Sequence, residues 1–239
     1  MQQEEEEVKK ERTFTYILPD VLLLKIFEHL DQDDKTHSEH ALNMFQARLE
    51  RNQMVVKSLT IKGTCPINLQ RIEHFPQLCT FISSGSDNLE NCHEILSKTG
   101  DSLKSLTIQD VHIDWHRMYA DIQKIYEVTD SVAIDFGLRE PELMRLSARK
   151  IEMRIGNLRP ESIFRFIQTW MNGNRILEKC TWNLKGSDFH FNVARFFRCF
   201  RSRMTSADFH QLYIRGNGKI TYRKDDFLQF EVVEIEELD

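Results

Sequence analysis

Apolar and polar residues alternate in six short runs between residues 56 and 184, and this pattern predicts six β-strands. The runs cover residues 56–61, 78–82, 103–108, 131–136, 150–155 and 178–184. Alternation with a period of two residues is typical of a strand that buries one of its two faces. The centres of the runs lie about 20 to 30 residues apart, a spacing typical of repeated strand–helix units.

Helices are predicted in segments between these strands, at residues 89–97, 115–128 and 160–170. The last is the clearest, because Pro160 suits a first helical turn and the Asn-Gly-Asn sequence at 172–174 suits a helix end. Its apolar stripe at helical spacing consists of Ile163, Phe166, Ile167 and Trp170. Strands that alternate with helices predict the α/β fold class.

One run resembles a leucine-rich repeat. Leu103-x-x-Leu106-x-Ile108-x-x-Val111-x-Ile113 fits that pattern, except that Val111 stands at the Asn or Cys position. Without a buried Asn ladder, backbone groups in the turns lose a regular partner. We therefore expect a short, irregular, leucine-rich-repeat-like α/β domain over residues 54–239. The alternative is an ordinary α/β domain whose strands happen to have this spacing.

The pattern changes after residue 190. Residues 191–204 predict an amphipathic helix with a stripe at Val193, Phe196, Phe197, Phe200 and Met204. Two alternating runs, 212–214 and 219–222, predict a β-hairpin, because the Asn217-Gly218 pair between them favours a type I′ turn with positive φ at both residues. A last strand is predicted at 228–235.

A helical module is predicted at residues 14–53, after a charged acidic segment at 1–13 that we expect to be disordered. Its first helix covers residues 18–30, with a stripe at Leu23, Ile26, Phe27 and Leu30. Leu22 and Leu24 lie beside the stripe, so this helix needs partners on two sides. We expect its own domain on one side and a second protein on the other. The alternative is a helix that only caps a larger domain.

The composition is that of a folded globular chain, since 41% of the 239 residues are hydrophobic and 29% are charged. No apolar run approaches the length of a membrane-spanning helix, and the acidic N-terminus lacks the apolar core of a secretion signal. Five scattered cysteines favour free thiols in a reducing compartment. We therefore expect a cytoplasmic or nuclear protein with no membrane partner.

The net charge of −5 argues against a general nucleic-acid binder. Arginines nevertheless concentrate between residues 145 and 203, and guanidinium groups match the geometry of carboxylates and phosphates. Arg195, Arg198 and Arg201 are therefore candidate residues for binding an acidic or phosphorylated target protein. The alternative is a set of solvent-exposed helix faces. RNA binding through these arginines lacks an accompanying aromatic stacking motif.

Motifs for catalysis or metal binding are not found in the sequence. Histidine pairs such as His112 and His116 lack the paired cysteine or histidine clusters of a structural zinc site. No Gly-x-Ser-x-Gly sequence is present, and Cys180 and Cys199 lie among apolar residues, where we expect buried thiols. We predict no enzyme activity, no metal and no cofactor.

Residues 18–30 resemble the first helix of an F-box. The matching residues are Leu18, Pro19, Asp20, Leu22, Leu23, Ile26, Phe27 and Leu30. Residues 31–49 lack the Trp of that family's second half, so the module resembles a truncated or divergent F-box. The resemblance implies binding to a Skp-type adaptor of a cullin–RING ubiquitin ligase through Leu18, Pro19, Leu22, Leu24, Ile26, Phe27 and Leu30.

Two later segments carry a second resemblance. Residues 166–173, which contain Trp170 and a Gly stop, precede the sequence Tyr-Ile-Arg-Gly-Asn-Gly-Lys at 213–219. This order resembles the F-box-associated domain of nematode F-box proteins and covers about residues 100–235. The resemblance implies a non-enzymatic substrate-recognition subunit of a Skp–cullin–F-box ubiquitin ligase. The alternative is a leucine-rich-repeat-like interaction scaffold with no ligase role.

Overall fold

The computed structural model describes residues 35–51, 56–62, 68–75, 77–85, 89–109, 122–185, 191–204, 206–215, 217–224 and 226–233. The helices in these ranges are α2 (Lys35–Glu50), α3 (Leu89–Lys98), α4 (Ile122–Glu127), α5 (Glu140–Leu143), α6 (Pro160–Met171) and α7 (Val193–Cys199), with a 3-10 helix η2 (Leu69–Arg71). The segments predicted as a disordered tail (1–13) and as the first helix of the module (18–30) lie outside the described residues.

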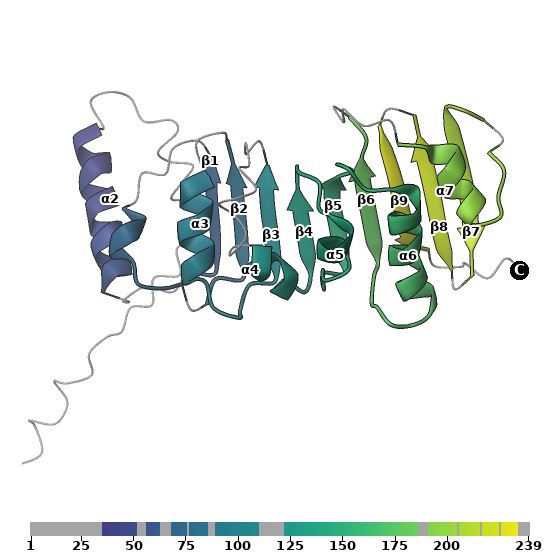
Figure 1. Ribbon diagram of the computed structural model, residues 1–239. Coiled ribbons are helices and arrows are strands. Elements are labelled where there is room, and N and C mark those ends of the chain that lie inside the picture. The colour runs from purple at the N-terminus through teal and green to yellow at the C-terminus, as the bar shows by residue number, and fades with distance from the viewer. Residues whose placement is uncertain are drawn as a thin grey trace, which may run out of the picture.

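The strands of the described chain form one nine-stranded sheet. They are β1 (Ser58–Lys62), β2 (Thr80–Ser84), β3 (Ser105–Gln109), β4 (Ser131–Ile134), β5 (Lys150–Arg154), β6 (Lys179–Asn183), β7 (Phe209–Ile214), β8 (Gly218–Arg223) and β9 (Phe227–Val232). Strands β1 to β6 are parallel and lie side by side in chain order (Figure 1). Strand β9 then pairs antiparallel with β6, β8 pairs with β9, and β7 forms the edge.

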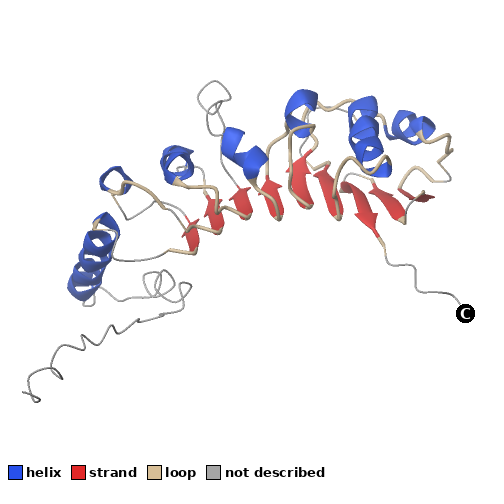
Figure 2. Ribbon diagram, turned by 90° about the horizontal axis from the view of Figure 1, so that it is seen from below, coloured by secondary structure: helices blue, strands red, loops and turns tan. Residues whose placement is uncertain are grey.

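Two rows of side chains in register bury one face of this sheet. The first row crosses all nine strands and consists of Leu59, Phe81, Leu106, Val132, Ile151, Cys180, Phe230, Ile220 and Leu212. The second consists of Ile61, Ser83, Ile108, Ile134, Met153, Trp182, Leu228, Tyr222 and His210. All of them except Leu212 are buried, and the helices cover this face on the convex side of an arched sheet (Figure 2).

The strand predictions between residues 56 and 184 are confirmed, each within two residues of its expected bounds. The helices predicted at 89–97 and 160–170 are α3 and α6, and α4 occupies the second half of the segment predicted at 115–128. The helix predicted at 191–204 is too long. It ends at Cys199 because Phe200 caps it and Arg201 adopts the left-handed region with φ 57°.

The predicted C-terminal hairpin is present as β7 and β8, but its turn differs from the prediction. Ile214 pairs with Gly218, which is the first residue of β8, so three residues separate the paired positions. Asn217 alone of the predicted pair has a positive φ, of 64°. Gly218 is buried, and a Cβ there would lie 2.7 Å from Ile214 Cγ1 and 2.9 Å from Phe230 Cε2. Close packing, and not turn geometry, requires the glycine.

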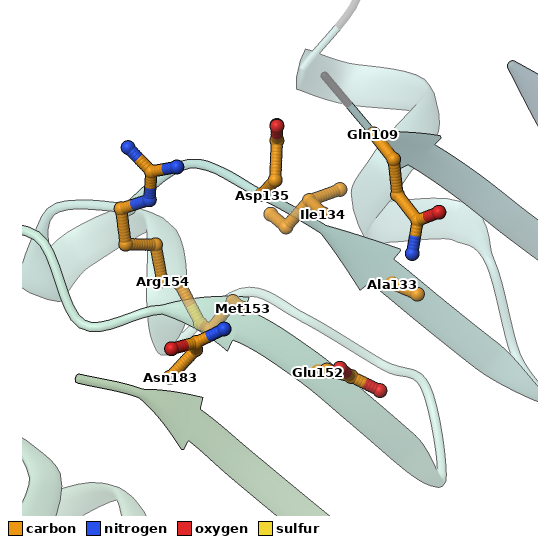
Figure 3. Close-up of a pocket in the computed structure, with 8 residues that line it drawn as sticks. All are labelled: Gln109, Ala133, Ile134, Asp135, Glu152, Met153, Arg154 and Asn183. Atoms are coloured by element: carbon orange, nitrogen blue, oxygen red, sulfur yellow. The ribbon is translucent and has the colours of Figure 1, made fainter. Parts of the chain in front are cut away.

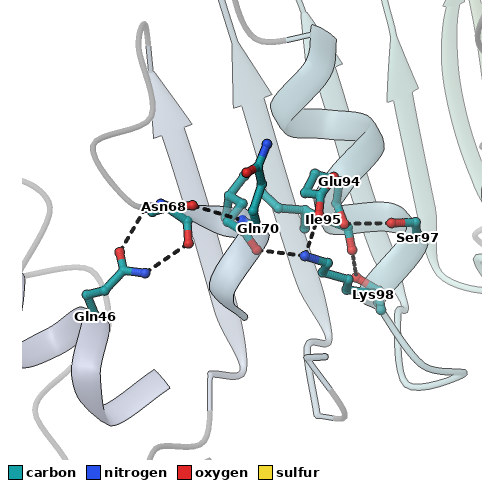
Figure 4. Close-up of polar contacts among 9 residues, drawn as sticks. Gln46, Asn68, Gln70, Glu94, Ile95, Ser97 and Lys98 are labelled. Carbon is teal, nitrogen blue, oxygen red and sulfur yellow. Dashed lines mark hydrogen bonds and ion pairs between the residues drawn. The ribbon is translucent and has the colours of Figure 1, made fainter. Parts of the chain in front are cut away.

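Helix α2 is fastened to the sheet end through η2 (Figure 4). Gln46 accepts a hydrogen bond from the backbone N–H of Asn68 and donates one to its carbonyl, both at 2.8 Å. The side chain of Asn68 in turn accepts from Gln70 N–H at 3.2 Å and caps η2. Lys98 of α3 donates to the carbonyl of Leu69 at 2.7 Å. The helical layer is therefore continuous from α2 to α3.

We expect Gly218→Ala to lower the free energy of unfolding by about 1–3 kcal/mol, because an added methyl overpacks a filled core. Asn217→Gly is the matched control in the same turn. It accepts the left-handed φ without adding atoms and should leave stability nearly unchanged. Urea unfolding of both variants tests this. A Gly218→Ala protein as stable as the wild type would contradict the packing described here.

Gln46→Ala removes both hydrogen bonds that hold α2 to Asn68. We expect it to lower the free energy of unfolding by about 1–3 kcal/mol, because each of the two bonds has a usual net value of about 0.5–1.5 kcal/mol. Hydrogen exchange at the amide of Asn68 should become faster in this variant. Asn43→Ala, at an exposed position of the same helix, should change neither quantity. Unaltered exchange at Asn68 in Gln46→Ala would show that α2 is held by other contacts.

Candidate functional site

The face of the sheet opposite the helices, here called the open face, carries polar side chains. On β1 to β4 most of these are hydroxyl side chains, namely Ser58, Thr60, Thr80, Ser84, Ser105, Thr107 and Ser131. From β5 onward most are charged or amide side chains, namely Lys150, Glu152, Arg154, Lys179, Asn183, Gln229, Glu231, Lys219 and Arg223. No helix of the described residues covers this face (Figure 2). The alternation of apolar and polar side chains along each strand therefore produces a broad polar surface.

A hollow of about 240 Å³ lies on the open face at the carboxyl ends of β3 to β6. Figure 3 shows its lining, which consists of Gln109, Ala133, Ile134, Asp135, Glu152, Met153, Arg154 and Asn183. Ala133 has the shortest of these side chains, and it lies in register between Thr107 and Glu152. The hollow forms because a methyl group stands where neighbouring strands carry longer side chains.

The strand ends around the hollow are held by close backbone contacts. Asp135 N–H donates to Ile108 O at 3.1 Å, and Ile155 N–H donates to Asn183 O at 3.0 Å. The turns after β4 and β5 touch, since a Cβ on Gly137 would lie 2.5 Å from the Cα of Gly156. Gly156 also has a φ of 53°, which side chains rarely accept. These contacts fix the ends of β4 and β5 beside each other.

The hollow combines carboxylate, guanidinium and amide groups. Ion pairs in this part of the structure involve Glu178 with Arg149 and with Lys150, whereas Glu152 and Arg154 make no ion pair with the described residues. On β8 and β9 the open-face charges do pair, as Lys219 lies 3.4 Å from Glu231. Glu152 and Arg154 are therefore open-face charges that lie at the hollow without an ion-pair partner among the described residues. They supply donors and acceptors suited to polar groups of a partner.

The arginines predicted to bind a target lie on α7 and just after its end. Arg195 on α7 pairs with Glu161 on α6, and the pKa of Glu161 is lowered by a backbone hydrogen bond and by this arginine. Arg198 is exposed, and its Nε donates to the carbonyl of Ala194 at 3.3 Å. Arg201 lies beyond the helix, at the edge of the sheet. The three residues share the helical side of the sheet and not the open face.

Other arginines of the 145–203 stretch also have local partners. Arg165 pairs with Glu140 at 2.6 Å. Arg175 lies 4.4 Å from the centre of the Phe166 ring and donates to Met144 O at 2.9 Å, and burial lowers the pKa of its guanidinium. Arg154 is the member of the stretch that lines the open-face hollow. The stretch is therefore distributed over several elements and is not a single basic patch.

The adaptor-binding residues predicted from the sequence are not placed by the structure. Leu18, Pro19, Leu22, Leu24, Ile26, Phe27 and Leu30 all lie outside the described residues. The hollow on the open face was missed at the sequence level. The polar positions of the predicted strands were the signal that could have found it, because β3 to β6 are adjacent and in register.

Cys180 is a buried thiol, as predicted, and burial raises its pKa well above the ordinary value. Cys199 is only partly buried, so the prediction of a buried thiol is wrong for it; this residue ends α7 and lines a second hollow. Among the described residues, no cluster of histidine, cysteine and acidic side chains could hold a metal ion. No helix in the described ranges is long and apolar enough to cross a membrane.

Comparisons with known proteins identify no family. A scan against protein-family models finds no match, and searches of curated proteins and of solved structures find none either.

Proposed function

We propose that this chain is a non-enzymatic substrate-recognition subunit of a Skp–cullin–F-box ubiquitin ligase. In this proposal residues 18–30 bind the adaptor, and the open face of the sheet holds the target protein. The observation that best supports target recognition is that the described helices cover only one face of the sheet. The helices pack on one face, and the other face presents in-register polar side chains around the hollow of Figure 3.

The chemistry of the open face favours a protein as the ligand. Its polar side chains extend from β1 through β6 to β9 and β8, whereas the hollow of about 240 Å³ occupies only the ends of β3 to β6. Glu152 and Arg154 offer opposite charges without an internal ion pair, beside the amides of Gln109 and Asn183. A protein surface can match both signs and the amides at once, and charged groups so arranged supply specificity and fast association.

Contacts near the C-terminus support the F-box-associated resemblance. Trp170 lies in the last turn of α6, the helix of the first motif, and its ring centre lies 4.7 Å from that of Phe230 on β9. A Cβ on Gly218, in the second motif, would lie 3.0 Å from Trp170 Cζ3. The two motifs, more than forty residues apart in the sequence, therefore pack against each other. The in-order parallel strands β1 to β6 likewise support a leucine-rich-repeat-like arrangement.

The alternative function is an interaction scaffold with no ligase role, in which the N-terminal helices only cap the sheet. The bonds from Gln46 to Asn68 favour a capping role for α2, because they fasten it to the sheet end. The two functions differ in adaptor binding, which the first experiment below measures. Target binding through the open face is common to both, and the second experiment measures it separately.

The adaptor test uses Leu22→Ala with Ile26→Ala in the full chain. Each apolar side chain buried at an interface contributes about 1.5–3 kcal/mol, so the double variant should bind a Skp-type adaptor more than a hundredfold more weakly. Lys25→Ala with His29→Ala, at polar positions of the same segment, is the matched control and should bind normally. Calorimetric titration gives both affinities. Equal adaptor binding by the apolar double variant and the wild type would contradict the ligase role and favour the scaffold function.

The target test uses Arg154→Glu with Glu152→Lys, which changes the charge of both unpaired groups in the hollow. Affinity capture followed by quantitative mass spectrometry should show one or more co-purifying proteins reduced roughly tenfold, the effect of about 1.4 kcal/mol. Adaptor recovery should stay unchanged. Arg198→Glu, exposed on the helical side, is the control. A capture profile that changes with Arg198→Glu and not with the open-face variant would return target binding to the predicted arginines.

A further inference from the structure

A second hollow, of about 350 Å³, lies at the β7 edge of the sheet beside α6 and α7. Its apolar lining consists of Phe164, Met171, Phe200, Leu212, Tyr213 and Ile214. Leu212 and Ile214 line it from the helical side of β7, whereas the side chains of Phe209 and Tyr213 alternate to the opposite face, where they are 46% and 67% exposed. An edge strand with apolar side chains beside it is a common feature of protein-binding surfaces.

The backbone of β7 is free to accept another strand. Lys224 N–H donates to Asp208 O at 2.8 Å, which makes residues 208 and 224 a hydrogen-bonded pair of the antiparallel ladder. Such hydrogen-bonded pairs alternate along the ladder. The backbone N–H and C=O groups of residues 210, 212 and 214 therefore also point toward β8, and those of Phe209, Gln211 and Tyr213 point outward. In the part of the chain that the structure describes, no hydrogen bond reaches these outward groups.

The charged side chains that line the hollow are all positive. Arg201 and Arg215 line it, and no acidic residue does among the described residues. Neither arginine forms an ion pair within the described ranges, whereas Arg165 and Arg195 on the neighbouring helices do. The hollow therefore presents two cations without their counter-charges.

Arg201 occupies a position where glycine is the usual residue. Ser202 N–H donates to Phe197 O at 3.1 Å and Arg201 N–H donates to Arg198 O at 2.9 Å, the pair of bonds that ends a helix with a left-handed residue. The φ of 57° at Arg201 disfavours any side chain. An arginine in this conformation places its cation at the hollow, where glycine would place none.

We propose that this edge binds an extended acidic peptide segment of a partner protein, which adds to the sheet as a strand beside β7. Backbone groups of the segment pair with Phe209, Gln211 and Tyr213. Every second side chain of the segment lies on the helical side, so one apolar residue enters the hollow. Acidic residues two positions away lie on the same side and meet Arg201 and Arg215. This edge site is separate from the open-face hollow and does not depend on the proposed ligase role.

The probe is a fluorescein-labelled heptapeptide, Thr-Glu-Thr-Ile-Thr-Glu-Thr, which places both acids and the apolar residue on one side of a strand. Its control replaces both Glu residues with Lys. Fluorescence anisotropy with the full chain should show binding of the acidic probe, and at least tenfold weaker binding of the basic one. Arg201→Glu with Arg215→Glu should weaken acidic-probe binding at least tenfold, and high salt should weaken it too.

Gln211→Pro tests the strand addition directly. Proline removes an outward N–H and spares the β7–β8 bonds, so acidic-probe binding should fall at least tenfold while the thermal midpoint stays close to that of the wild type. Gln211→Ala keeps the N–H and should bind as the wild type does. If Gln211→Pro does not fold, the arginine double variant and the two probes still decide the question.

Several outcomes would overturn the proposal. Equal binding of the acidic and basic probes would exclude recognition by charge. Undiminished binding by a folded Gln211→Pro would exclude strand addition. The wild type could instead fail to bind the probe and form a dimer, measured by light scattering, that Gln211→Pro abolishes. That result would assign the edge to a second copy of the chain. Arg154→Glu should bind the probe normally, so failure of the open-face proposal is distinguishable from failure of this one.

Discussion

The two in-register rows of buried side chains are the constraint on which the rest of the structure depends. Because side chains alternate along a strand, a shift of one residue in any strand would move its row residues, such as Leu106 and Ile108 on β3, out of the core. The rows therefore fix the register of nine strands together. They also assign the helices to one face, which leaves the polar positions of the same strands on the other.

The C-terminal third of the chain completes the sheet with antiparallel strands. Aromatic side chains pack between this part of the sheet and the helices that cover it. Phe166 packs edge-on against Trp182, and Phe164 packs edge-on against Phe200. These rings join α6 to β6 and α6 to α7, and Phe197 on α7 packs edge-on against the ring of His210 on the edge strand β7. Tyr213, further along β7, keeps an exposed ring.

Local periodicity was enough to predict β1 to β6, because each strand buries one face and neighbours in the sequence are neighbours in the sheet. It could not predict that β9 pairs with β6, since that pairing joins segments about fifty residues apart with no local signal. Nor could it show that Glu161 and Glu140, on other elements, pair with Arg195 and Arg165. The Gly218 prediction named the right residue for the wrong reason, since the surrounding side chains, and not its own φ, exclude a Cβ.

The position of β9 between β6 and β8 has a consequence for the order in which the fold assembles. Strands β1 to β6 can be added one after another, each on a neighbour that already exists. The ribbon of β7 and β8 has no such neighbour until residues 227–232 arrive, and an isolated two-stranded ribbon is at best marginally stable in water. The last described strand thus joins the ribbon to the sheet, and a chain stopped before it would carry a hairpin with no strand partner in the sheet.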